Sequence, residues 1–323
     1  MAPRYKITYE YVGKYFTGWQ RLTYDINPLP VQNVLENSLK HICNKEIKVF
    51  GSSRTDSGVS ALGNTSHFDI DQRTSRKGKP LPLLTTDELT MAINYNVGEQ
   101  YLDRVRIIKT EIVDDNFHSR FHATSRTYLY KILANCGKKQ TPLELLDRVL
   151  EISFILDVNK MKEAAEILVG RHDFSSFRSK DCTKNPVRTI EYIKIIELPT
   201  PEIIRYHPDF INCSKEINNN VNHGLQYIGI EIKAQSFLHN QVRIMSSALI
   251  EVGKGTITKD QLKEILEKKD RLAAPSTIAS EPLTLIKVSY DHKKNIENNI
   301  DNNNNIDNNS ISNRIIKFLK KIF

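Results

Sequence analysis

The feature that most constrains the fold is a succession of short segments whose apolar residues repeat with either strand or helix spacing. Apolar and polar residues alternate over residues 4–12, which predicts a strand, whereas apolar residues three or four apart over residues 31–44 predict a helix. Several predicted strands follow one another with no helix between them. We therefore expect an α+β fold with mostly antiparallel sheets flanked by helices, in two related halves.

The same patterns place the remaining elements and suggest where the halves divide. Further strands are predicted at 47–50, 65–70, 105–113, 127–134, 187–198, 225–234 and 283–290, and further helices at 86–95, 158–169, 238–252 and 259–267. We expect an N-terminal half over residues 1–115 and a C-terminal half over residues 116–292. Residues 293–323 are rich in Asn and end in a short basic segment, which predicts a disordered tail because little apolar surface could be buried.

Composition favours a polyanionic partner and gives no sign of a cofactor. The 46 Lys and Arg residues exceed the 38 Asp and Glu residues, and nucleic acid is the commonest partner of such a chain. No apolar run approaches the ~18 residues of a membrane-spanning helix. The four cysteines form no C-x-x-C pair, the histidines have no metal-binding spacing, and no nucleotide-binding signature occurs, so we expect neither metal nor cofactor. His239 is interpreted as a capping or packing residue.

The N-terminus alternates like a strand from its first residues and shows no presequence. We expect the protein in the cytosol, with the mitochondrion and the nucleus as alternatives.

The loop from Gly51 to Ala61 carries the first candidate for chemistry. It places Asp56 two residues after Arg54, among glycines and serines, between two predicted strands. Small residues let a ligand approach the backbone closely, so Asp56 is a candidate catalytic acid. A turn in which Asp56 caps a helix is the alternative.

Three further segments carry candidate residues. Trp19 follows the first predicted strand and is interpreted as an aromatic that anchors a turn rather than one that stacks on a ligand. Tyr128 shares a strand face with Arg126 and could stack on a base or relay a proton, although packing within the sheet would explain it equally well. Arg243 opens the most apolar helix, where it would be solvated unless it lies close to Asp56 as a counter-ion.

Over residues 4–290, the chain resembles the TruA family of tRNA pseudouridine synthases. The resemblance rests on five motifs in the family's order, namely Gly18–Gln20 with Val31–Glu36, Gly51–Ala61, Ala123–Tyr130, Phe237–Met245, and Ala274–Pro275 with Pro282–Leu285. Details such as Ser52 to Asp56 are more similar to the pseudouridine synthase-like protein one branch than to the bacterial enzyme.

Two positions depart from the family pattern. Ser60 stands where the family loop has a histidine, and Pro282 stands where the family has a glycine before Leu283. Ser60 follows the candidate acid, so we expect activity to persist. The loop from Pro275 to Pro282 is longer than usual and bears directly on the contact expected of Leu283.

The resemblance implies a pseudouridine synthase fold, with a catalytic cleft between its halves, and the isomerisation of uridine to pseudouridine in tRNA without a cofactor. Asp56 would be the nucleophile, attacking C1′ of the sugar or C6 of the base. Arg243 would pair with Asp56, and such a neighbour lowers the pKa of a carboxyl group by about 1–3 units. Tyr128 would stack on the target base and Leu283 would form an apolar wall on its other face. Arg54 would fill the space that the base leaves on flipping out.

The resemblance also implies a homodimer whose tRNA path crosses both subunits. The basic run from Arg73 to Lys79 would contact phosphates, or it is simply a solvated loop. The competing hypothesis is a non-catalytic RNA-binding or RNA-chaperone protein on the same scaffold. Pure binding would not require Asp56, Tyr128 and Arg243 together, so we favour the enzyme.

Overall fold

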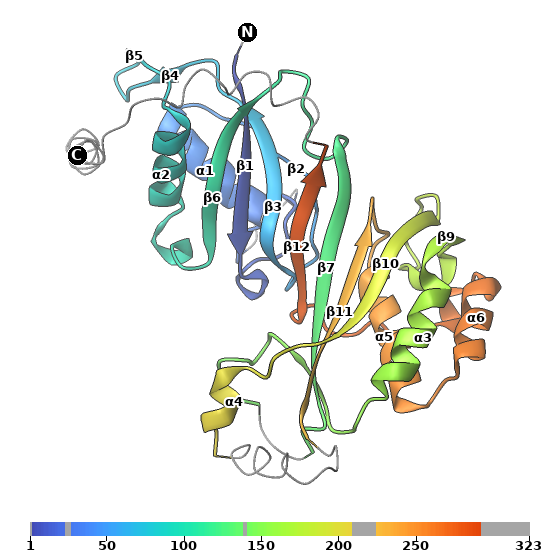
Figure 1. The fold of residues 1–323 in the computed structure, drawn as a ribbon. Coiled ribbons are helices and arrows are strands. Elements are labelled where there is room, and N and C mark those ends of the chain that lie inside the picture. The colour runs from blue at the N-terminus through green and yellow to red at the C-terminus, as the bar shows by residue number, and fades with distance from the viewer. Residues whose placement is uncertain (1, 23–26, 138–140, 209–223, 292–323) are drawn as a thin grey trace, which may run out of the picture. The chain divides into compact units, whose positions relative to one another are not determined.

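One mixed sheet of ten strands runs through the computed structural model, which describes residues 2–22, 27–137, 141–208 and 224–291. Its strands are β1 (Arg4–Tyr11), β2 (Phe50–Gly51), β3 (Ser60–Asp69), β6 (Val105–Val113), β7 (Ala123–Ala134), β8 (Leu150–Ile152), β9 (Gly170–Asp173), β10 (Val187–Glu197), β11 (Gln226–Ala234) and β12 (Leu283–Tyr290). They lie in the order β6–β1–β3–β12–β7–β11–β10–β9, with β2 beside β3 and β8 beside β7 (Figure 1). Among the described pairings, only β12 with β3 and β7 with β8 run parallel. A separate pair joins β4 (Arg73–Thr74) and β5 (Pro80–Leu81).

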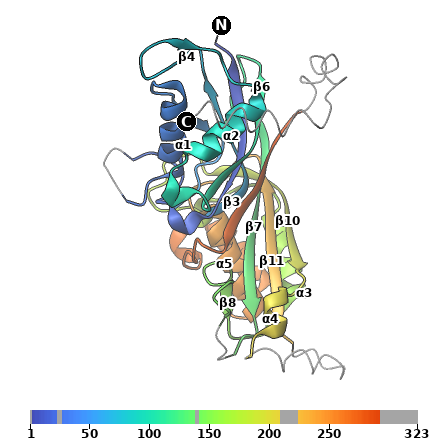
Figure 2. The ribbon, with the colours of Figure 1, turned by 90° about the vertical axis from the view of Figure 1, so that its left-hand side faces the viewer.

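The helices stand in two groups beside the sheet. They are α1 (Val31–Cys43), α2 (Thr86–Asn96), α3 (Val158–Leu168), α4 (Glu202–Tyr206), α5 (Gln241–Lys254) and α6 (Lys259–Lys268). In both views α1 and α2 lie together beside β1, β3 and β6, whereas α3 and α5 lie beside β10 and β11 (Figure 1 and Figure 2). Each group covers an apolar sheet face, and the larger core lies under α3, α5 and α6. No helix in the described part of the chain is long and apolar enough to cross a membrane.

The structure confirms the predicted α+β class with mostly antiparallel pairing, and strands of both expected halves join one sheet. Residues 105–113 and 283–290 form strands as predicted. The structure differs at β3, which begins at Ser60 rather than near residue 65, because the small residues that open it lack an alternating pattern. The short strands β8 and β9 and the helix α4 were not predicted. The division into residues 1–115 and 116–292 stays a prediction, and the expected tail at 293–323 lies outside the described residues.

Trp19 lies in the core and anchors the loop from Gly51 to Ala61. Its ring is 2% exposed, and its Nε1 donates a hydrogen bond to the Tyr9 hydroxyl at 2.6 Å. Its backbone N–H donates to the carbonyl of Thr55 at 3.0 Å, directly before Asp56. The burial agrees with the interpretation of Trp19 as an anchoring aromatic.

Gly51 packs against that ring, which yields a test of this core. A Cβ atom on Gly51 would lie 2.2 Å from the ring of Trp19, which has no room to move. We expect Gly51→Ala to lower the free energy of unfolding by about 1–3 kcal/mol, measured by urea denaturation. Gly224→Ala is the control, because a Cβ there meets nothing within 4 Å. Equal stability of the two variants would contradict this packing.

Candidate active site

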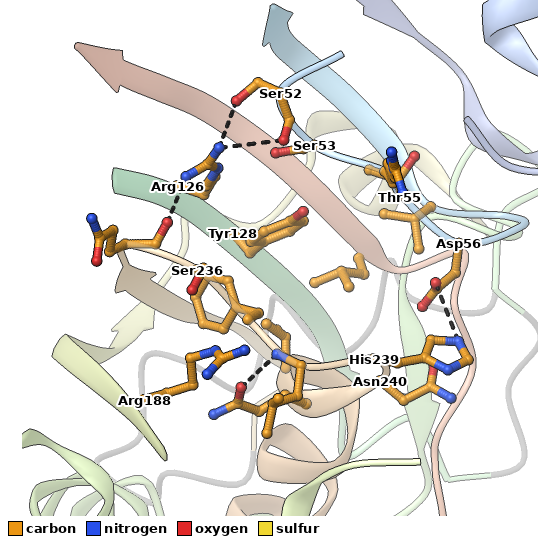
Figure 3. A pocket seen from close by; sticks show the side chains of 18 of the residues that line it. Ser52, Ser53, Thr55, Asp56, Arg126, Tyr128, Arg188, Ser236, His239 and Asn240 are labelled. Atoms are coloured by element: carbon orange, nitrogen blue, oxygen red, sulfur yellow. Dashed lines mark hydrogen bonds and ion pairs between the residues drawn. The ribbon is translucent and has the colours of Figure 1, made fainter. Parts of the chain in front are cut away.

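A cavity of about 530 Å3 opens where the loop between β2 and β3, the strand β7 and the loop between β11 and α5 meet. Asp56 is the one carboxylate among the described residues that line it. Six lysine and arginine side chains also line it, namely Arg54, Arg120, Arg126, Lys184, Arg188 and Arg243. Figure 3 shows Asp56 and His239 on one side of this cavity and Arg126 with Ser52 on another. The cavity is therefore strongly cationic around a single acid.

Backbone contacts fix the Asp56 loop at both ends. The Ser52 N–H donates to the carbonyl of Thr65 at 2.8 Å, and the Val59 N–H donates to the carbonyl of Asp56 at 3.2 Å. Gly58, at φ +84°, leaves room for the side chains of Ser280 and Glu281, where a Cβ would collide. The loop leads into β3, so Asp56 does not cap a helix.

The carboxylate of Asp56 faces His239 and Arg243 but bonds tightly to neither. Its Oδ1 lies 3.5 Å from Nε2 of His239, and its Oδ2 lies 3.9 Å from Nη1 of Arg243. Burial raises the pKa of Asp56 above its ordinary value, and His239 and Arg243 only partly oppose that rise. Arg243 thus lowers the pKa of Asp56, as expected of such a neighbour, but the desolvation of the carboxylate outweighs the effects of His239 and Arg243.

Arg243 is held by its own helix and by a neighbouring loop. Its Nε donates to the carbonyl of Ile278 and its Nη1 to Oδ1 of Asn240, both at 2.8 Å. Asn240, the residue before α5, adopts a left-handed backbone with φ 61°. The structure thus brings Arg243 to Asp56, as predicted, but as a positioned neighbour with bonds of its own.

His239 is the site residue that the sequence interpretation missed. It neither packs in the core nor caps α5, since its side chain is 57% exposed and its ring lies closer to Asp56 than Arg243 does. Its backbone carbonyl accepts a hydrogen bond from the Ser179 N–H at 3.1 Å, which fixes the loop. Its place four residues before Arg243, in the same motif, was the signal that could have identified it.

Tyr128 and Leu283 lie in the cavity wall on neighbouring strands. Tyr128 of β7 pairs with Leu285 of β12, and its ring meets Phe237 edge-on with centroids 5.4 Å apart. Burial raises the pKa of Tyr128 to about 12, so its hydroxyl stays protonated at neutral pH. Leu283 is buried at the first position of β12 and also lines the cavity. Both predicted residues are thus brought to the same place as Asp56.

Arg126 ties three lining segments together. Its guanidinium donates to the hydroxyl of Ser52 at 2.9 Å, to the carbonyl of Arg120 at 2.9 Å and to the carbonyl of Gln235 at 2.6 Å. Burial lowers the pKa of Arg126, and an arginine keeps its charge at neutral pH. The strand pattern placed Arg126 beside Tyr128 but could not show this bridging role.

Of the remaining residues that the sequence analysis singled out, Arg54 lines the cavity, whereas Ser60, Pro282 and Arg73 lie outside it. Arg54 is exposed and lines the cavity. Ser60 lies outside it, where its hydroxyl accepts a hydrogen bond from the Gly13 N–H at 3.0 Å. The carbonyl of Pro282 accepts from the Lys131 N–H at 3.3 Å, which fixes the altered loop beside β7. Arg73, in the basic run, does not line the cavity and donates hydrogen bonds to the carbonyls of Ile42, in α1, and Pro82.

Comparisons with known proteins agree with the motif order. A family model described as tRNA pseudouridine synthase matches residues 164–291. The tRNA pseudouridine synthase A of Ehrlichia chaffeensis is 36% identical over 289 residues, which are 89% of this chain and 100% of that protein. The proteins of the same name from Anaplasma phagocytophilum, at 37% identity over 89% of this chain, and Parvibaculum lavamentivorans, at 36% over 90%, are also covered completely.

These three relatives are bacterial proteins, so the closer likeness to the pseudouridine synthase-like protein one branch stays a prediction. Similarity at this level over nearly the whole of each relative is sufficient to assign the family. The chain belongs to the TruA family of tRNA pseudouridine synthases.

Proposed function

We propose that this protein isomerises uridine to pseudouridine in tRNA, with Asp56 as the nucleophile that acts on a flipped-out uridine. The observation that carries the proposal is a single, partly buried carboxylate in a cavity lined by six lysine and arginine side chains. A polyanionic substrate fits such a cavity. The names of the bacterial relatives supply the substrate class.

The reaction needs a group that can both attack and leave. In the isomerisation the bond between C1′ and N1 breaks and a bond between C1′ and C5 forms, while C5 loses a proton and N1 gains one. A carboxylate suits covalent catalysis of this kind. Asp56 attacks C1′ or C6, and both routes start from its ionised form. Burial strips water from the carboxylate, and His239 and Arg243 favour its ionisation.

The cavity walls supply contacts for a base taken out of the stack. Tyr128 offers an aromatic ring and Leu283 an apolar side chain in the same cavity. Arg54 lies exposed at the cavity, where it can occupy the space that the base vacates. The surrounding cations would hold phosphates without reading sequence.

The assembly and the location are part of the same proposal. We expect a homodimer whose tRNA path crosses both subunits, in the cytosol, with the mitochondrion and the nucleus as alternatives. The competing hypothesis remains an RNA-binding protein without turnover. It predicts tRNA binding that does not depend on the charge of Asp56 and no change in the RNA.

Tritium release from tRNA labelled at C5 of uridine tests the enzyme and its nucleophile together. Asp56→Asn should reduce the rate by at least about 1,000-fold, because an amide cannot replace the nucleophile. Filter binding of tRNA should persist in this variant. Equal release by wild type and Asp56→Asn would contradict the role of Asp56, and tRNA binding by wild type without release would favour the competing hypothesis.

The raised pKa of Asp56 predicts that ionising this carboxyl group lowers the free energy of unfolding of the protein. Because the pKa is higher in the folded than in the unfolded chain, the cost is fully present above the folded pKa and vanishes below the unfolded pKa of ~3.9. Asp56→Asn should therefore raise the urea midpoint at pH 7 and lose that gain as the pH falls towards 3.

Asp69 provides a control, because its charge should stabilise the fold where that of Asp56 destabilises it. Arg4 holds the pKa of Asp69 below its usual value through a 2.7 Å contact, so its stabilisation is present at pH 7 and is lost in acid. Asp69→Asn should cost up to about 1 kcal/mol at pH 7, since the pair is partly exposed. A shift of the same sign in both variants would refute the electrostatic account of Asp56.

His239 should influence the acid limb of the pH–rate profile, which the ionisation of Asp56 sets. His239 lies closer to Asp56 than Arg243 does and lowers the pKa of Asp56, so His239→Gln should move the acid limb of kcat/KM to higher pH. His239→Lys keeps a cation at the same position and should shift the limb less. An acid limb unchanged in His239→Gln would show that the imidazole has no influence on Asp56.

A further inference from the structure

Next to the cavity, aromatic rings follow one another across the surface. The centroid of Phe121 lies 4.3 Å from that of His118, and His118 lies 6.2 Å from Phe50. Phe121 is 71% exposed and Phe50 is 47% exposed. Phe121 also lines the cavity, so these three residues, the aromatic shelf, continue the active site outwards.

Hydrogen bonds beneath the shelf hold it in place. His67 is buried and stacks under Phe50 with centroids 5.1 Å apart. Ser119 donates its N–H to Nδ1 of His67 at 3.2 Å and its hydroxyl to the carbonyl of Phe50 at 2.6 Å. The Arg120 N–H donates to Nδ1 of His118 at 3.1 Å. The exposed rings therefore stand on a fixed support and need little ordering when they bind.

The charges around the shelf suit RNA rather than an apolar partner. Arg120 lies with its guanidinium carbon 5.5 Å from the centroid of Phe121 and lines the cavity. Burial lowers the pKa of His67 to about 4 and also lowers the pKa of His118, so these two rings are neutral at pH 7. Neutral rings beside a fixed cation match the alternation of bases and phosphates in a single strand.

We propose that the aromatic shelf stacks an unpaired RNA base adjacent to the target uridine, while Arg120 contacts the phosphate between them. This inference rests on the proposed function, since it places the target uridine in the cavity. Flipping one nucleotide disturbs the stacking of its neighbour, and a ring at the cavity edge restores that stacking. The shelf would thereby contribute to RNA affinity without reading base edges.

The test compares tRNA affinities of matched variants by filter binding at fixed salt. Phe121→Leu should weaken binding by about 5- to 140-fold, the range expected for loss of one stacked base. Phe121→Trp should bind like wild type because it keeps a stacking face. Phe154→Leu is the control, since Phe154 is 67% exposed but does not line the cavity.

Salt dependence separates stacking from charge. Phe121→Leu should leave the slope of log Kd against log salt unchanged, whereas Arg120→Gln should reduce it by about 1. Thermal melting checks that each variant folds, and Phe50→Leu, on the same shelf, provides a second reading of stacking.

Unchanged affinity in both Phe121→Leu and Phe50→Leu, or an equal loss in Phe154→Leu, would overturn the proposal. Wild type that binds tRNA without turnover would overturn the proposed function alone, because the affinity comparison would still stand. Wild type that fails to bind tRNA would overturn both.

Discussion

The last strand, β12, is the constraint on which the site depends. It pairs in parallel with the start of β3, where Thr284 lies opposite Ser60, and antiparallel with β7, where Leu285 lies opposite Tyr128. Since β3 begins four residues after Asp56, this arrangement fixes the Asp56 loop over β7. Residues far apart in the chain thus share one cavity because one strand joins the two parts of the sheet.

The cavity is lined by six lysine and arginine side chains, yet none of them forms a short salt bridge with Asp56. Arg126 donates hydrogen bonds to backbone carbonyls and to the Ser52 hydroxyl, and Arg243 donates to the carbonyl of Ile278 and the side chain of Asn240. The bonds of Arg243 hold it 3.9 Å from the carboxylate of Asp56, and the nearer contact of that carboxylate is with His239 at 3.5 Å. If Asp56 is the nucleophile, as we propose, the absence of a short salt bridge leaves its carboxylate free to attack, and the other cations of the cavity would contact phosphates.

Periodicity predicted elements such as α1 and β6 because each of these buries mainly one face. The ordered motifs, and not the periodicity, indicated that Asp56 and Tyr128 would meet. The start of β3 and the bridging bonds of Arg126 could not be read from local patterns, whereas His239 was missed although it shares a motif with Arg243. The start of β3 and the bonds of Arg126 depend on tertiary contacts, which the local sequence around a single charged or small residue does not indicate.

The claim on which the rest turns is that burial raises the pKa of Asp56 more than His239 and Arg243 lower it. The most direct measurement is a pH titration of its side-chain carbon by NMR, with aspartate labelled at Cγ and the signal assigned by its absence in Asp56→Asn. A pKa above the ~3.9 of an unperturbed aspartate is the predicted result. A pKa at or below that value would contradict it, and would mean that Arg243 and His239 form a tight ion pair with Asp56 in solution.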